Sequence, residues 1–192
     1  MAMSSGSFSP WRDVWLKPRA TMTALQKSKE FQYADMLFFI GGAGFGVISA
    51  VRTELLEYWR PINIMVSIMI GGMGSLLFNN IFAGILSQTG KWFKGTGNTQ
   101  QVKLALGWSM PPIILLIPLS LFPIVLADDQ TRIGLTVVLQ ILMSIYSFGI
   151  TIGMLSIVHK HHWSVSMLNF VLGLIILWSP IILYFGIWSL MT

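Results

Sequence analysis

The chain has no cysteine and few charged residues, and both shortages limit what it can be. Of its 192 residues, 10% are charged and 54% are hydrophobic, whereas a soluble domain carries about 25% charged residues. The missing cysteines exclude disulfides, thiolate metal ligands, a nucleophilic thiol and lipids attached through sulfur. Residues 1–31 also lack the apolar core of a secretory signal, about 7–15 residues long. We therefore expect no cleavable leader.

Catalytic constellations are missing too. No nucleophile–base pair and no paired carboxylates fall within the apolar stretches, so we expect no enzyme activity and no cofactor or metal. The glycine-rich run at residues 41–44 lacks the third glycine and the preceding strand of a dinucleotide motif. Residues 90–96 have the spacing of a phosphate loop but lack its lysine. These patterns exclude a nucleotide-binding fold.

What the sequence does contain is five long apolar stretches, at residues 34–51, 62–87, 104–126, 133–158 and 165–190. In a bilayer only helices and closed barrels satisfy their backbone amides. The stretches exceed the ~10 residues of a barrel strand and show no period of two. We predict an all-α membrane protein, a five-transmembrane-helix bundle at residues 34–190. A cytoplasmic N-terminal segment with an interfacial helix, residues 1–33, precedes it.

The predicted interfacial helix begins at Pro10, because proline is favoured at the first helical position. Trp11, Val14 and Trp15 then form an apolar stripe at i, i+3 and i+4. Pro18 should interrupt this helix. The alternative is a disordered basic tail.

Lysine and arginine residues are distributed unevenly between the two predicted sides of the membrane. With five spans, nine of the twelve fall before the first span and in the links at 88–103 and 159–164, and three fall on the other side. This bias predicts a cytoplasmic N-terminus and an outside C-terminus. The net charge of +5 is then expected to meet anionic lipid headgroups rather than nucleic acid.

Glycines recur in the first two apolar stretches, at the same spacing 30 residues apart. Small residues let helix backbones approach closely, so the two runs are predicted to face each other. The predicted packing positions are Gly41, Gly42, Gly44, Gly71, Gly72, Gly74, Gly149 and Gly153. A self-association face remains the alternative for the pairs at GxxxG spacing, Gly42–Gly46 and Gly149–Gly153.

Polar and proline residues inside the spans are candidates for a solute path. The third stretch holds four prolines and should be kinked or partly unwound. The candidate lining is Asn79, Asn80, Gln140, Pro111 and Pro112, although interhelical hydrogen bonds explain the amides as well. Asp35, at the start of the first stretch, is expected to reach water or to pair with Lys27 or Lys29.

The glycine-rich link after the second stretch leads into a helix predicted to start near Gln100. Its free amides and nearby lysines could hold a lipid phosphate or a partner's carboxylate; an ordinary capped turn is the alternative. We predict a cytoplasmic contact surface for a partner or lipid made of Trp11, Trp15, Arg19, Lys91, Trp92, Lys94 and Lys103.

Three imidazoles gather in the next cytoplasmic link, at His159, His161 and His162. No Asp, Glu or Cys lies nearby in sequence to complete a metal shell, so an interface loop is favoured over a metal site. If these histidines have a function, pH sensing is the more economical one.

Two short motifs support a family resemblance. Pro10-Trp11, Trp15 and Pro18-Arg19-Ala20-Thr21-Met22 look like a Trp/Pro juxtamembrane segment, and Gly107-Trp108-Ser109-Met110-Pro111 follows a glycine-rich link. In these features, with five spans, the chain resembles the Yip family of Ypt/Rab-interacting membrane proteins, in its bacterial branch. The resemblance implies a small inner-membrane protein that accompanies exporters. The family's Asp-Leu-Tyr-Gly-Pro motif is missing, so GTPase binding is not implied.

These observations lead to a prediction of function. We expect a non-enzymatic membrane scaffold or accessory subunit, beside a transporter or in an envelope-stress complex, whose partner is another membrane protein or a second copy. The alternative is a small-solute or ion transporter with its path along the proline-bent third span.

Overall fold

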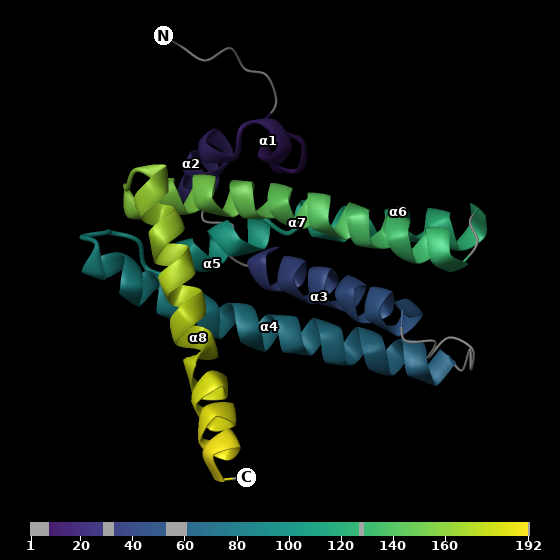
Figure 1. Ribbon diagram of the computed structural model, residues 1–192. Helices are drawn as coiled ribbons and strands as arrows, with labels where there is room; N and C mark the ends of the chain where they lie inside the picture. Colours follow the sequence, from purple (N-terminus) through teal and green to yellow (C-terminus); the bar gives the residue numbers. More distant parts are fainter. Residues whose placement is uncertain (1–7, 29–32, 53–60, 127–128, 192) are drawn as a thin grey trace.

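The computed structural model describes residues 8–28, 33–52, 61–126 and 129–191, and these residues form helices joined by short links. In chain order the helices are α1 (Pro10–Leu16), α2 (Pro18–Ser28), α3 (Tyr33–Arg52), α4 (Pro61–Trp92), α5 (Thr99–Trp108), α6 (Pro111–Leu126), α7 (Asp129–His159) and α8 (Trp163–Met191). No strand occurs within the described ranges. The predicted all-α class is confirmed (Figure 1).

The predicted number of five spans is wrong. Among the described residues, four segments are long and apolar enough to cross a bilayer: Ile62–Trp92, Thr99–Leu119, Gly134–His159 and Trp163–Gly186. The first apolar stretch instead forms a shorter apolar helix, Tyr33–Ser49 within α3. At 1.5 Å per residue this apolar part reaches about 25 Å, which is less than the ~30 Å of a hydrocarbon core, whereas the whole of α3, 20 residues to Arg52, reaches about 30 Å. The prediction that the C-terminus lies outside depended on an odd number of spans, and it loses that basis.

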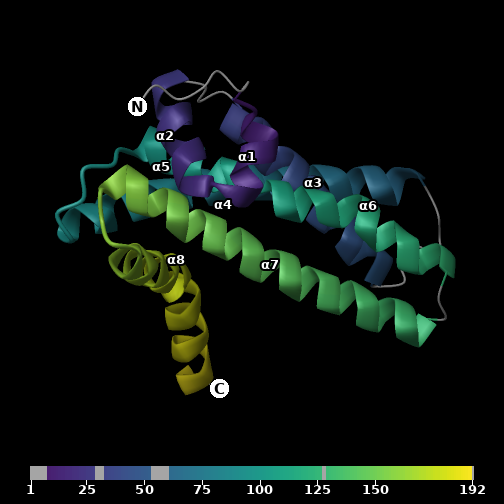
Figure 2. The ribbon, with the colours of Figure 1, turned by 90° about the horizontal axis from the view of Figure 1, so that it is seen from above.

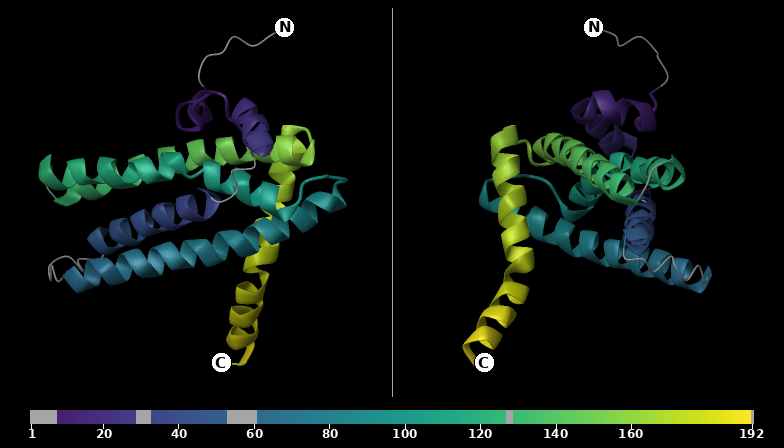
Figure 3. Two further views of the ribbon diagram at one scale, coloured as in Figure 1. Left: turned by 180° about the vertical axis from the view of Figure 1, so that it is seen from behind. Right: turned by 45° about the vertical axis from the view of Figure 1, so that its right-hand side comes forward.

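Helices α3, α4, α6 and α7 lie alongside one another, whereas α8 runs across them (Figure 1). The view from above shows α6 beside α7 and α8 leaving the bundle near the end of α7 (Figure 2). The first turns of α8 pack against α4 and α7, and its second half extends away from them (Figure 3). The arrangement is therefore a bundle with one crossing helix.

A buried asparagine attaches α8 to α4. Asn169 has no exposed surface; its side-chain oxygen accepts a hydrogen bond of 2.6 Å from the Thr89 hydroxyl, and its amide donates to the Leu86 carbonyl at 3.2 Å. One turn further, Gly173 lies directly against the Leu86 side chain. After Pro180 the side chains of residues 181–186 are all exposed. Only the first half of α8 belongs to the packed core.

The predicted distortion of the third apolar stretch is a complete break. Helix α5 ends at Trp108, and α6 begins at Pro111 after two residues outside the helices. Proline lacks an amide hydrogen and disfavours helical geometry in the residue before it. The break follows from the Pro111-Pro112 pair, and α6 then continues to Leu126.

The N-terminal segment forms two helices that pack on the bundle. Pro10 begins α1, and Pro18 begins α2 one residue after α1 ends. Val14 is fully buried, and the Trp15 ring stacks on Tyr146 of α7 with centroids 5.9 Å apart. Met22 of α2 is also fully buried, and α2 packs along α7. The predicted apolar stripe thus has a protein partner in α7.

Candidate functional site

The predicted contact surface separates into an exposed part and a packed part. Lys91, Trp92 and Lys94, at the end of α4, are exposed, with 64% of Trp92 accessible. The only hydrogen bond recorded for these three side chains, within the described residues, joins Lys91 to Gln88 at 3.4 Å on the surface. This group can meet a partner without disturbing the core.

Lys103 belongs to the packed part. Its ammonium group lies 2.7 Å from a carboxylate oxygen of Asp35, and the other oxygen of Asp35 accepts from the Asn80 amide at 3.2 Å. The expected pairing of Asp35 with Lys27 is wrong, and Lys29 lies outside the described residues. The carboxylate joins α3, α4 and α5, so Lys103 is not free to bind a partner.

The three N-terminal members of the predicted surface are divided as well. Trp15 packs on Tyr146, whose hydroxyl donates to the Trp15 carbonyl oxygen. Trp11 is 48% exposed, and its ring meets the buried Trp108 edge-on at 5.3 Å. Arg19 is exposed, with its Cγ 3.7 Å from the position that a Cβ on Gly153 would occupy. Only Trp11 and Arg19 offer surface to a partner here.

Residues 93–98, which we call the link, turn sharply between α4 and α5. The Gly95 amide donates to the Gly90 carbonyl and the Lys94 amide to that of Lys91, with Lys94 in the left-handed region at φ 65°. This is the Schellman pattern of helix ends, here with lysine where glycine is usual. The end of α7 repeats it, with Lys160 at φ 58°.

The start of α5 satisfies its own amides. The Asn98 side chain accepts from the Gln101 amide at 2.9 Å, and the Gln101 side chain accepts from the Asn98 amide at 3.2 Å. This capping box uses two of the donors that the predicted phosphate site required. Since Lys103 is also engaged with Asp35, the capped-turn alternative is the better description of the link.

The link and the end of α4 enclose His159, the last residue of α7. Only 1% of this residue is exposed. A methyl group added to Gly90 would overlap its ring, and one on Gly95 or Gly97 would lie 2.6 or 3.0 Å from its Nδ1. None of the three glycines has a positive φ. They are required for the close approach of backbone to imidazole rather than for an unusual backbone angle.

His161 lies beside His159 in the same enclosure. The two rings stack with centroids 5.6 Å apart and planes 19° from parallel. Both ring nitrogens of each residue are buried without a hydrogen-bond partner among the described residues. His162 is exposed and bonds to Ser164 instead. In the same part of the chain no third His, Cys, Asp or Glu joins the pair to hold a metal.

The predicted glycine positions divide by contact. A methyl group on Gly42 would overlap the backbone of Gly71 and the side chain of Ser75, so α3 and α4 touch backbone to backbone there. Other glycines pack against side chains: Gly41 on Met110, Gly44 on Ile117 and Gly72 on Phe39. Gly74 and Gly149 face open space, and Gly153 lies 3.7 Å from Pro18 and Arg19.

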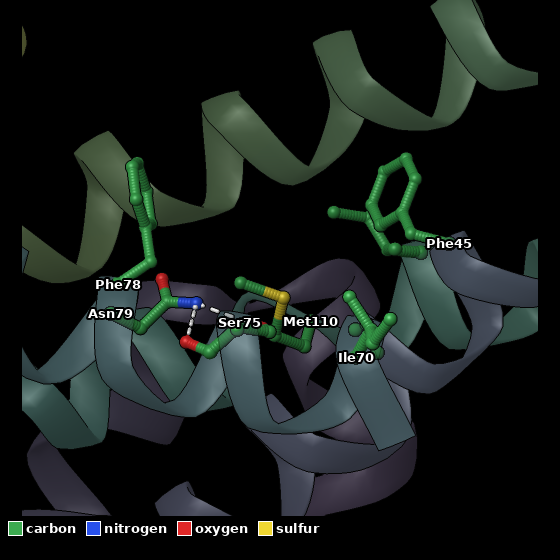
Figure 4. A pocket seen from close by; sticks show the side chains of 11 residues that line it. Phe45, Ile70, Ser75, Phe78, Asn79 and Met110 are labelled. Atoms are coloured by element: carbon green, nitrogen blue, oxygen red, sulfur yellow. Dashed lines mark hydrogen bonds between the residues drawn. The ribbon is translucent and has the colours of Figure 1, made fainter. Parts of the chain in front are cut away.

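A cavity of about 450 Å³ opens beside this glycine contact, between α3, α4 and the start of α6. Its walls are mainly apolar, and its polar groups are Ser75 and Asn79. Figure 4 shows these two side chains next to each other on α4, where the Asn79 amide donates to the Ser75 hydroxyl at 3.0 Å. Phe45, Ile70 and Met110 line the rest of the labelled view.

The other residues of the predicted solute path do not line this cavity. Asn80 bonds to Asp35 and to the Leu76 carbonyl, Gln140 is half-buried on α7, and Pro111 and Pro112 are buried. Adjacent helix residues such as Asn79 and Asn80 point about 100° apart. The structure therefore does not bring the predicted set together in one path.

The enclosure of His159 was not predicted, although the sequence carries a signal for it. Three glycines, at positions 90, 95 and 97, lie at the end of α4 and in the link, and Lys91 and Lys94 fall between the first two of them. Since no positive φ requires them, they indicate that a bulky group lies against the backbone. What the sequence does not reveal is that this group comes from residue 159.

Comparison with known proteins gives one match. A family model described as the Yip1 domain matches residues 12–192, and so includes every helix from α2 to α8 and nearly all of α1. No curated protein and no solved structure matches the chain.

Proposed function

The chain belongs to the Yip1 domain family, and on that premise we propose that it acts as a non-catalytic scaffold or accessory subunit of a larger membrane assembly. The match confirms the family resemblance, and with four apolar helices it makes the chain an integral membrane protein. Its proposed setting is a bacterial cytoplasmic membrane, beside a transporter or in an envelope-stress complex.

The observation that carries the proposal is the exposed end of α4. Lys91, Trp92 and Lys94 present two cations and an indole ring to the surroundings. Cationic groups attract acidic segments and anionic headgroups, and exposed tryptophan is typical of both interfaces and headgroup regions. A partner membrane protein with an acidic juxtamembrane segment fits this surface.

The same end is proposed to face the cytoplasm. The end of α4, the link and the α7–α8 turn lie at one end of the bundle, with α2 packed on α7 near them (Figure 1). They carry Arg19, Lys91, Lys94 and Lys160, and lysine and arginine accumulate on the cytoplasmic side of membrane proteins. This argument depends on the grouping of cations at one end, not on the number of spans.

The test is affinity purification of the full chain from native membranes in mild detergent, with quantitative mass spectrometry. We expect one other membrane protein in stoichiometric amount, and its loss when Lys91→Glu and Lys94→Glu are combined. The control combines Lys17→Glu and Lys27→Glu, which change the charge equally at exposed positions of the N-terminal segment. That variant should retain the partner.

Equal recovery from the two variants would contradict the proposed surface, and recovery of the chain alone would contradict the accessory role. The alternative function, a small transporter, would then be tested by solute uptake into proteoliposomes containing only this protein. It has less support because Asn79 is the one member of the predicted path that lines the cavity.

A further inference from the structure

His159 and His161 place four buried ring nitrogens in one enclosure without a hydrogen-bond partner among the described residues. A buried polar atom left without a partner destabilises the fold, so such atoms call for an explanation. The stacking of the two rings at 5.6 Å makes them one unit. They are joined to the contact surface because the glycines beside His159 flank Lys91 and Lys94 in sequence.

The surroundings of the pair contain cations and no carboxylate. Lys91 lies on the last turn of α4, Lys94 in the link, and Lys160 and His162 in the α7–α8 turn. Lys103 of α5 is already paired with Asp35. Helices α4, α5 and α8 and the link contain no Asp or Glu, and on α7 the one acidic residue is Asp129, at the opposite end. Among these elements no anion is available to a protonated imidazole.

A protonated imidazole therefore cannot remain in the closed enclosure. Burying an unpaired charge is far more costly than burying a neutral group, and here the new charge would also face a second imidazole and a cationic link. Movement of the link away from the rings would let water reach them and relieve this cost. Gly95 and Gly97 of the link lie against the imidazole, so its movement breaks this contact together with the packing of Gly97 on Val158 and its hydrogen bond from Ser87.

We propose that the pair His159–His161 is a proton-operated latch: the neutral rings hold the link closed, and protonation releases it together with Lys91 and Lys94. The inference that release changes partner binding rests on the proposed function of that surface. The latch itself does not, because it is a movement of the link that can be measured without a partner.

The direction of the pH dependence follows from linkage. Protons bind to the open form, in which an imidazole in water titrates near pH ~6.5, so acid favours the open form. Above this pH an imidazole is neutral in either form, and the ratio of open to closed form is constant. Below it, uptake of one proton raises the open-to-closed ratio by up to about tenfold per pH unit.

The experiment uses the absence of native cysteine. Thr96, exposed at the middle of the link, is replaced as Thr96→Cys and labelled with a nitroxide in the full chain, in vesicles of a neutral phosphatidylcholine. Electron paramagnetic resonance then reports the mobile and immobile fractions of the label. We expect an immobile link at about pH 7.5 and a mobile fraction that rises as the pH falls through about 6.5 to 5.5.

Two variants test whether His159 carries the effect. His159→Gln and His159→Phe cannot take up a proton in this range, so a variant that shows the immobile label at about pH 7.5 should keep it at about pH 5.5. His162→Gln is the matched control, since that ring is exposed and bonded to Ser164; it should retain the wild-type transition. The immobile label at neutral pH also shows that a variant has folded.

A wild-type link whose mobility does not change with pH would overturn the proposal, as would an acid transition that persists in a folded His159 variant. Failure of the proposed function is seen separately, as unchanged partner recovery by the Lys91→Glu/Lys94→Glu variant at neutral pH. The two proposals can therefore fail independently: label mobility tests the latch, and partner recovery tests the contact surface.

Discussion

The hydroxyl of Ser147 on α7 donates a hydrogen bond of 2.6 Å to the main-chain oxygen of Ser109, in the break between α5 and α6. Both residues are buried. A helix that stops before a proline pair leaves carbonyl groups without their amide partners, and in an apolar interior each must be satisfied by another group. The Ser147 side chain of α7 thus satisfies a carbonyl group that the break between α5 and α6 leaves without a backbone donor.

Ser147→Ala should therefore destabilise the protein by about 1–2 kcal/mol, because the Ser109 oxygen stays buried without its donor. The measurement is equilibrium unfolding in mixed micelles. Ser144→Ala is the matched control on the same helix, since Ser144 is exposed; it should change the free energy of unfolding by less than about 0.5 kcal/mol. Equal effects of the two substitutions would contradict the role of the hydrogen bond.

Gly42→Ala should force α3 away from α4. The added methyl group would overlap the Gly71 carbonyl oxygen, and overpacking of this kind costs about 1–3 kcal/mol. Gly74→Ala, three residues beyond Gly71, is the control because nothing lies within 4 Å of its added methyl group. That change should be neutral or stabilise α4 by up to about 1 kcal/mol. Thermal unfolding of both variants in one detergent gives the comparison, and a less stable Gly74→Ala would argue against this packing.

Asp35 and Lys103 should show a small coupling energy in a double-mutant cycle. The side chains are 46% and 23% exposed, so solvent screens the pair, and about 0.5–1 kcal/mol is expected. The cycle uses Asp35→Asn and Lys103→Met, with the free energy of unfolding as readout. A second cycle, which combines Asp35→Asn with Lys27→Met, should give no coupling energy. Coupling to Lys27 instead would restore the pairing expected from the sequence.

Lys94→Gly should stabilise the end of α4. Lys94 occupies the left-handed region, which costs a residue with a Cβ about 1 kcal/mol and costs glycine little. Lys91→Gly, within the last turn of α4, should instead destabilise by up to about 1 kcal/mol. Both variants remove one lysine, so charge loss cancels in the comparison of their unfolding free energies. Changes of the same sign in the unfolding free energy of both variants would show that the backbone angle of Lys94 is not the cause.

Much of the helical plan could be predicted from the sequence, because it follows from local chemistry. Apolar length separates membrane helices from links, and Pro18 and Pro111 start helices where proline is tolerated. The glycine runs that gave the contact between Gly42 and Gly71 were visible as a repeated spacing. The number of spans was overestimated because the apolar part of α3, Tyr33–Ser49, falls just below the length needed to cross a bilayer. Hydropathy shows that a segment is apolar, but it predicts less well whether the apolar helix is long enough to cross a bilayer.

The candidate site could not be predicted, because its contacts join distant parts of the chain. Asp35 lies 68 residues from Lys103, and several lysines were equally reasonable partners in the sequence. His159 was assigned to an interface loop because no Asp, Glu or Cys lies nearby in sequence to complete a metal site. In the structure it is the last residue of α7 and is enclosed by glycines from another link. The burial of His159 depends on how the end of α7 packs against the end of α4 and the link, which the local sequence does not determine.

The short apolar part of α3 also has a consequence for how the protein is made. The chain is synthesised from its N-terminus, so α3 leaves the ribosome before α4. The apolar part of α3, Tyr33–Ser49, falls just short of the hydrocarbon core, and at Gly42 and Gly46 the backbone of α3 lies against Gly71 and Ser67 of α4. We expect α3 to wait at the membrane surface until α4 has been translated, and insertion of this protein then begins with its second apolar helix.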